Sequence, residues 1–68
     1  MNVGGRVKFI GADDEQVAWG SNDDPREHLV PGDVYTITNV EMHKWHTKIM
    51  LKNLPNLKFN SVSFEDVE

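Results

Sequence analysis

The sequence predicts an all-β domain, either a sandwich or a small barrel, and two observations carry this prediction. Short apolar runs are separated at regular intervals by turn residues, chiefly Gly, Pro, Asn and Asp, and such spacing is typical of all-β domains. The clearest run, residues 34–40, is dense in the β-branched and aromatic side chains that favour strands. With 68 residues, the chain has room for a single domain over residues 1–68, with a small core.

The first part of the chain is expected to hold one strand and a long loop. Residues 6–10 alternate weakly, with Val7 and Phe9 on one face, which suffices for a half-buried strand. Residues 12–28 are mostly polar, and a loop longer than about 12–15 residues is usually functional or contains a hidden element. The one apolar island in this loop predicts a short strand over residues 16–20.

The second part is expected to supply the remaining strands. Residues 34–40 form the central strand, and residues 47–52 alternate cleanly, with the apolar side chains inward and the lysines outward. After a turn at 53–56, the chain resumes at 57–59 and ends in further apolar contacts.

A helix is the alternative structure for residues 41–53. Lysines recur there at every fourth position, and Met42, Trp45 and Ile49 would form a buried stripe. No Ser, Thr, Asp or Asn stands at the natural start to cap such a helix, and Trp, His, Thr and Ile gather in its middle. We therefore prefer two strands joined by a hairpin connection.

Three features of the sequence follow one another: the pattern Leu29-x-x-Gly32-x-x-Tyr35-x-Ile37-x-x-Val40, an aliphatic strand at 49–51, and then Phe59 with Phe64-Glu65-x-Val67. Together they resemble a small SH3-like β-barrel. The resemblance implies five short strands, a long first loop at 12–28 and a short helical turn near 60–63 before the last strand. The chain lacks the Ala-Leu-Tyr-Asp-Tyr run and the adjacent Trp pair of peptide-binding SH3 domains. Recognition of proline-rich peptides is therefore not implied.

Three local strings carry a second resemblance: Val17-x-Trp19-Gly20, Trp45-His46-Thr47-Lys48 and Phe59-Asn60-Ser61-Val62-x-Phe64-Glu65. They look like those of short bacteriophage and prophage proteins. Small phage accessory proteins of this kind look like modulators or inhibitors of host machinery, including defence systems.

Composition narrows the functional classes. The chain has no Cys, which removes disulfides, thiol catalysis, thiolate zinc sites and iron–sulfur ligation. No apolar run approaches the roughly 18 residues of a membrane span, and the start is not a signal peptide. Neither a phosphate-binding glycine loop nor a plausible nucleophilic triad is present. We expect a cytoplasmic protein that is not an enzyme, with no catalytic residues, no cofactor and no membrane contact.

Charge is divided along the chain. The formal net charge of −4 argues against a protein that coats nucleic acid indiscriminately. Residues 42–64, however, hold four lysines and no acid. With Trp45 at the end of this segment, Lys44 and Lys48 could hold phosphates or a single strand of nucleic acid. The alternative is an ordinary solvated lysine face.

The run Met42-His43-Lys44-Trp45-His46 is the strongest candidate site. It lies where two strands meet, so Trp45 is expected at or near a hairpin tip, either as a binding anchor or folded back over the core. His43 and His46 could face each other across a two-residue turn. No third ligand is evident, so we expect hydrogen bonding or a pH-sensitive contact and no metal.

These features favour a non-enzymatic phage-type protein that binds and modulates or inhibits a host protein, with host defence machinery as one class of target. Contacts would come from the hairpin and from the acidic first loop, in which Asp13 and Asp14 could engage a basic partner.

Two alternatives remain open. The first is a homo-oligomer that sequesters a nucleotide, a defence signal for example, between subunits. Trp19, Trp45 and Tyr35 would stack on the base, the two hairpin histidines would form hydrogen bonds, and the lysine face would hold the phosphates. The second is a small barrel that binds nucleic acid through residues 44–58, which the net charge disfavours.

Overall fold

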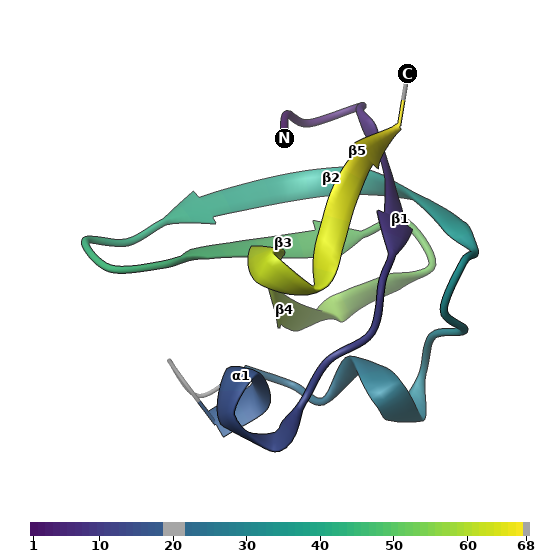
Figure 1. Ribbon diagram of the computed structural model, residues 1–68. Helices are drawn as coiled ribbons and strands as arrows, with labels where there is room; N and C mark the ends of the chain where they lie inside the picture. The colour runs from purple at the N-terminus through teal and green to yellow at the C-terminus, as the bar shows by residue number, and fades with distance from the viewer. Residues whose placement is uncertain (19–21, 68) are drawn as a thin grey trace.

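Five antiparallel strands form one sheet in the order β4-β3-β2-β1-β5 (Figure 1). The computed structural model describes residues 1–18 and 22–67, and all statements of structure refer to these residues. The strands are β1 (Arg6–Phe9), β2 (Val34–Met42), β3 (Thr47–Leu51), β4 (Leu54–Asn60) and β5 (Phe64–Val67). The prediction of a small all-β, barrel-like fold with five strands is confirmed.

A bulge in β2 allows this strand to pair with β1 over its first part and with β3 over its second part. Its first residues pair with β1, as Thr36 with Arg6, and its later residues pair with β3, as Val40 with Ile49. The register shifts between Ile37 and Asn39, and such a bulge bends a strand and increases its twist. As a result β1 and β5 cross over β2 and β3, and the sheet curls around its own core (Figure 1).

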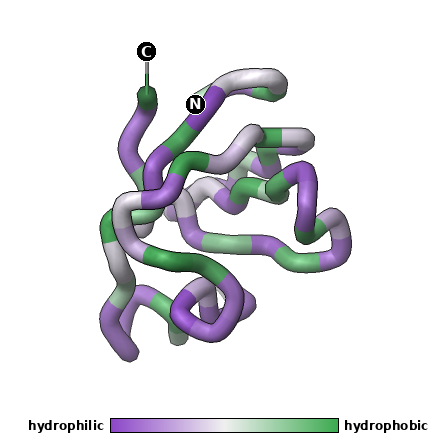
Figure 2. Tube along the Cα trace, turned by 90° about the vertical axis from the view of Figure 1, so that its right-hand side faces the viewer, coloured by the Kyte–Doolittle hydropathy of each residue, from purple (hydrophilic) through white to green (hydrophobic). Residues whose placement is uncertain are grey.

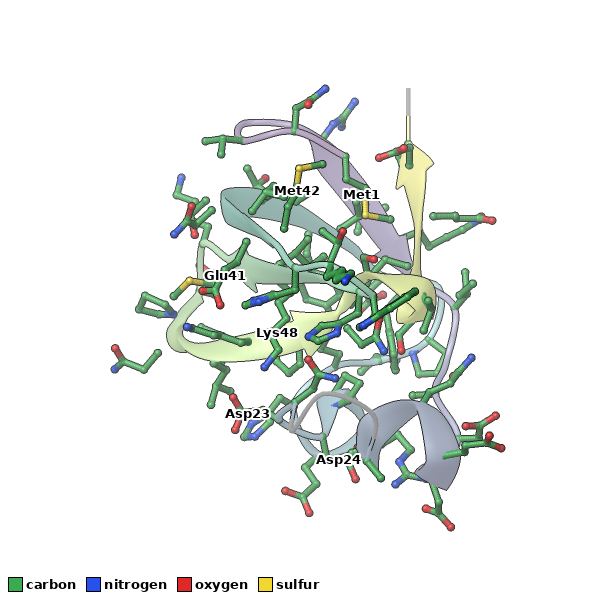
Figure 3. All side chains as sticks on the ribbon, turned by 90° about the vertical axis from the view of Figure 1, so that its left-hand side faces the viewer. Met1, Asp23, Asp24, Glu41, Met42 and Lys48 are labelled. Carbon is green, nitrogen blue, oxygen red and sulfur yellow. The ribbon has the colours of Figure 1, made fainter. Side chains whose placement is uncertain are left out.

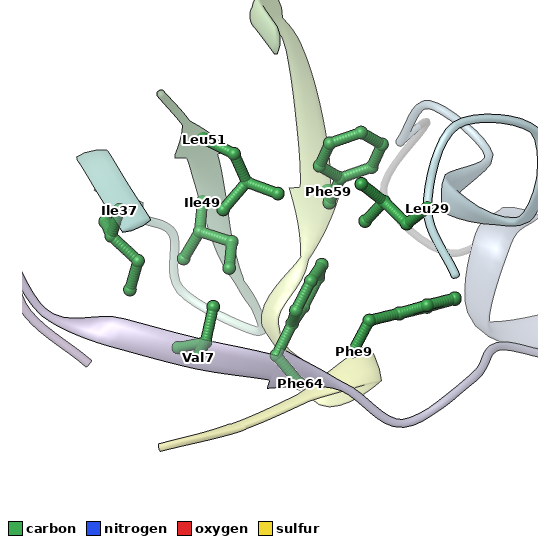
Figure 4. Packing of buried hydrophobic residues seen from close by; sticks show 8 residues of the cluster. All are labelled: Val7, Phe9, Leu29, Ile37, Ile49, Leu51, Phe59 and Phe64. Carbon is green, nitrogen blue, oxygen red and sulfur yellow. The ribbon is translucent and has the colours of Figure 1, made fainter. Parts of the chain in front are cut away.

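The core takes at least one side chain from every strand. Apolar and polar residues alternate along the trace (Figure 2), and the side chains that turn inward form a single cluster (Figure 4). Phe64 lies at its centre, with ring centroids 5.6 Å from Phe9 and 6.2 Å from Phe59 in tilted arrangements that suit aromatic pairs. The full cluster consists of Val7, Phe9, Leu29, Ile37, Ile49, Leu51, Phe59 and Phe64.

The strand preferred for residues 47–52 is confirmed, and the helical alternative over 41–53 is wrong. β3 buries Ile49 and Leu51, two residues apart, as the alternation predicted. It pairs with β2, so that Glu41 faces Lys48 and Met42 faces Thr47.

The predicted turn at 53–56 is too long. β4 already begins at Leu54 and runs through Pro55. β4 is an edge strand of the sheet, and an edge position is where a strand tolerates proline.

The short strand predicted over residues 16–20 is wrong. Residues 16–18 belong to a short helix, α1 (Asp14–Ala18), and residues 19 and 20 lie outside the described residues. The backbone N–H of Gln16 donates to Asp13 Oδ1 (2.7 Å), and the backbone N–H of Asp13 donates to Gln16 Oε1 (3.2 Å). This reciprocal capping box starts a helix.

The long first connection also holds a 3₁₀ turn, η1 (Pro25–Glu27), and contacts the edge of β4. The backbone N–H of Asp23 donates to the Lys58 carbonyl, and the backbone N–H of Lys58 donates to Asp23 Oδ2, both at 2.9 Å. Asp23 thus forms hydrogen bonds with the backbone N–H and carbonyl of Lys58, which face away from β3.

Two turns appear where the sequence placed them. The predicted helical turn before the last strand is confirmed as η2 (Ser61–Ser63), where Asn60 Oδ1 accepts from the backbone N–H of Val62. Before β2, Gly32 has a φ of 94°, and the backbone N–H of Asp33 donates to the Val30 carbonyl (3.1 Å). A Pro-Gly pair with a positive φ at the glycine is typical of a type II turn.

Candidate binding surface at the β2–β3 hairpin

The β2–β3 hairpin ends in a tight tip formed by Lys44 and Trp45. The backbone N–H of His43 donates to the His46 carbonyl (2.8 Å), which leaves two residues to make the turn. The expected hairpin connection, with Trp45 at its tip, is therefore present. The hairpin extends beyond the rest of the molecule (Figure 1).

Two large apolar side chains are exposed at this end of the molecule. Trp45 is 74% exposed and Met42 is 82% exposed. Of the two placements left open for Trp45, the structure has the exposed one, so the indole does not cover the core. The Lys44 ammonium lies over the Trp45 ring, 5.3 Å from its centroid, within the range of a cation–π contact.

The two histidines next to the tip lie face to face. The rings of His43 and His46 are stacked, with centroids 4.8 Å apart and 19° between their planes. This is the cross-turn arrangement that their spacing suggested.

A carboxylate connects this histidine pair to the neighbouring strand. Glu41 Oε1 accepts a hydrogen bond from His43 Nε2 (2.6 Å), and Glu41 Oε2 lies 2.7 Å from Lys58 Nζ on β4. The hydrogen bond from Lys58, followed by that from His43, lowers the pKa of Glu41 below its ordinary value. Glu41 is therefore held in its ionised form.

We call the residues Glu41, His43, His46, Lys48 and Lys58 the outer face of the hairpin. Val40 and Ile49, their neighbours in the strands, pack against the core or lie within it. Because side chains alternate across a strand, the outer-face residues point away from the core. Figure 3 views the molecule from this end and labels Glu41, Met42 and Lys48.

The predicted acidic residues are not part of this surface. Asp13 caps α1 through its hydrogen bonds with Gln16. Asp14 Oδ1 lies 2.9 Å from Arg26 Nη1, and Arg26 also pairs with Asp24. Both acids thus contribute to the local structure at the start of α1, within the first connection and not on the hairpin (Figure 1).

The predicted aromatic residues are not gathered in one place either. Tyr35 packs partly against the core, and its hydroxyl accepts a hydrogen bond from the backbone N–H of Val30 (3.1 Å). It lies at the opposite end of β2 from Met42, about 23 Å away along the strand. Trp19 lies outside the described residues.

Sequence reasoning included Lys58 only within residues 44–58, and it missed Glu41 and the contact between the two. The contact joins β2 to β4, which are separated by β3 in the sheet, and no local pattern encodes such a distant pair. Among the residues that the structure describes, no group of three His, Asp or Glu side chains is arranged to hold a metal ion, and no pocket is found.

The described part of the chain thus defines a small all-β protein with an exposed tryptophan hairpin. Residues 20–68 match the family described as Bacteriophage T4 protein Y07B. The match spans most of the chain, which therefore belongs to this phage protein family, and the resemblance to short phage proteins is confirmed. No curated protein and no solved structure gave a match. Within residues 1–18 and 22–67, no helix has the length and apolar character needed to cross a membrane.

Proposed function

We propose that this phage protein is a non-enzymatic binding protein that acts in the cytoplasm of the bacterial host. It binds a host protein through the β2–β3 hairpin and thereby modulates or inhibits it, with host defence proteins as one class of target. The observation that carries the proposal is the pair of exposed side chains, Trp45 and Met42, at the end of the hairpin.

Exposed tryptophan on a small protein favours a binding role over a packing role. Tryptophan is among the residues that most often dominate the energy of protein–protein interfaces. Met42, near the end of β2, is exposed as well, and methionine is a flexible side chain suited to adaptable binding surfaces. The two side chains together offer an apolar anchor that the core does not use.

The hairpin also presents this anchor in a fixed position. The His43–His46 backbone hydrogen bond closes the turn, their rings stack, and Glu41 ties the end of β2 to Lys58 on β4. A surface ordered before binding loses less conformational entropy when it binds. Membership of a phage family adds that the protein is made in an infected bacterium, where host proteins surround it.

Affinity capture from host lysate with the Trp45→Ala variant tests the proposal. We expect this variant to lose the partner that the natural chain captures, while its melting temperature stays unchanged, because the indole is not part of the core. Val30→Ala, which also shortens an exposed apolar side chain but lies outside the hairpin, is the matched control and should retain capture. Undiminished capture by Trp45→Ala would refute the proposal, as would parallel losses of capture and melting temperature.

A further inference from the structure

The hairpin tip carries positive charge that the rest of the protein does not neutralise. Lys44 at the tip and Lys48 on β3 form no ion pair among the residues that the structure describes. From Met42 to Phe64 the sequence contains no Asp or Glu. Of these two lysines, Lys44 lies over the exposed indole, and neither has a counter-charge of its own in the described part of the chain.

Glu41 does not neutralise these lysines. Its two oxygens are engaged by His43 and Lys58, at 2.6 and 2.7 Å. The carboxylate charge is thus balanced by Lys58, and Lys44 and Lys48 remain as the excess charge.

This arrangement contrasts with the composition of the chain, which has 11 acids and only 7 Lys and Arg. Lys8, Arg26 and Lys58 do pair with acids, whereas Lys52, just after β3, has no ion pair among the described residues either. Exposed pairs of this kind contribute little to folding. Unpaired lysines beside an exposed apolar anchor instead supply the electrostatic complementarity that speeds and orients association.

The same observations favour a protein partner over nucleic acid. The net charge of −4 opposes a uniform polyanion, whereas an acidic patch of limited size has to meet only the positive charge at the tip. Met42, more exposed even than Trp45, suits an apolar pocket better than a stack of bases. A pocket with carboxylates at its rim would bury the exposed apolar side chains and also give the positive charge at the tip its counter-charges.

From this we infer that the hairpin tip docks on an acidic protein surface, in which an apolar pocket takes Trp45 and Met42 and carboxylates around the pocket meet Lys44. The inference rests on the proposed function and names the chemistry of the partner.

The test is a titration followed by ¹⁵N NMR, which reports the Trp45 indole N–H directly. The probes are a synthetic peptide of alternating Glu and Leu, the same peptide with Lys in place of Glu, and an oligothymidylate. We expect the Glu–Leu peptide alone to shift the signals of Trp45 and Met42. We also expect its affinity to fall severalfold as salt rises from 50 to 300 mM, because salt screens exposed charges.

Two matched variants localise the effect. Lys44→Glu should reduce the affinity for the Glu–Leu peptide at least fivefold. Lys52→Glu makes the same charge change in the turn just after β3, about 16 Å from Thr47, and should leave the affinity within twofold. Neither variant should shift the melting temperature, since both lysines are exposed.

Three results would overturn the inference: no shift at Trp45 with the Glu–Leu peptide, an equal response to the Lys–Leu peptide, or preferential binding of the oligothymidylate. If any of these occurred while Trp45→Ala still abolished capture from lysate, the proposed function would stand and only the acidic partner would be rejected. If Trp45→Ala captured normally, the proposed function itself would fail.

Discussion

Glu41 on β2 forms an ion pair with Lys58 on β4, with 2.7 Å between Oε2 and Nζ, although β3 lies between these strands. Two such strands are roughly 10 Å apart, so the contact needs two long side chains that lie across the sheet. Its effect is to tie the projecting hairpin to the edge strand. The hairpin is thereby held by a side-chain contact in addition to its backbone hydrogen bonds.

This ion pair should make the protein sensitive to acid. The pKa of Glu41 is lowered from 4.5 in the folded chain, so the carboxylate stabilises the fold above about this pH. That stabilisation is lost as the pH falls through the lowered pKa. We expect the melting temperature to drop below pH 4.5 by more in the natural protein than in Glu41→Gln, measured by circular dichroism.

Glu15→Gln is the control for this experiment, because it neutralises an exposed acid on α1. Its melting curve should follow that of the natural protein over the whole pH range. Identical acid profiles for Glu41→Gln and the natural protein would contradict the role of the pair.

Ile49, on the β3 arm of the hairpin, is fully buried, so Ile49→Val should destabilise the fold by about 0.5–1.5 kcal/mol through one lost methylene and the space it leaves. Denaturant unfolding measures this change. Val62→Ala, at an exposed position, removes more apolar volume and should nevertheless cost less. A larger loss of stability for Val62→Ala than for Ile49→Val would mean that Ile49 is not part of the core.

Gly32 provides a test of the turn before β2. No atom lies within 4 Å of the position that a Cβ would take, so the effect of Gly32→Ala comes from its φ of 94° alone. We expect a loss of about 1 kcal/mol in unfolding free energy. Gly32→Asn should lose less, because asparagine tolerates positive φ better than alanine. Equal stability of the alanine variant and the natural chain would exclude this turn.

Asn60 joins three parts of the chain and is almost completely buried. Its Oδ1 caps η2 at Val62, and its Nδ2 donates to the Gln16 carbonyl of α1 (3.4 Å). Asn60→Ala should cost about 1–2 kcal/mol of stability, the usual effect of losing a cap. Asn56→Ala, at an exposed position in β4, should change the unfolding midpoint little. A neutral Asn60→Ala would show that neither hydrogen bond matters.

The sequence predicts the strands well where burial alternates cleanly. In β3 both buried positions are apolar, so Ile49 and Leu51 identify their own face. The alternation fails in the first connection, where a short apolar island suggests a strand. There the reciprocal hydrogen bonds of Asp13 and Gln16 decide the local structure, and their Asp-x-x-Gln spacing was a signal that the apolar residues obscured.

The surface at the hairpin was predictable only in part. The spacing of His43 and His46 indicated a two-residue turn and hence the position of Trp45. The exposure of the Trp45 side chain was not predictable, because this exposure depends on how far the hairpin extends beyond the core. The contact between Glu41 and Lys58 was equally hidden, since it follows from the order of strands in the sheet.

The attachment of Asp23 to Lys58 has a consequence for how the protein meets other chains. An edge strand with free backbone groups invites another chain to extend the sheet. Asp23 already occupies the N–H and the carbonyl of Lys58, and proline at position 55 removes a further donor from the same strand. The acidic first connection therefore covers this part of β4 and shields it from the addition of another strand.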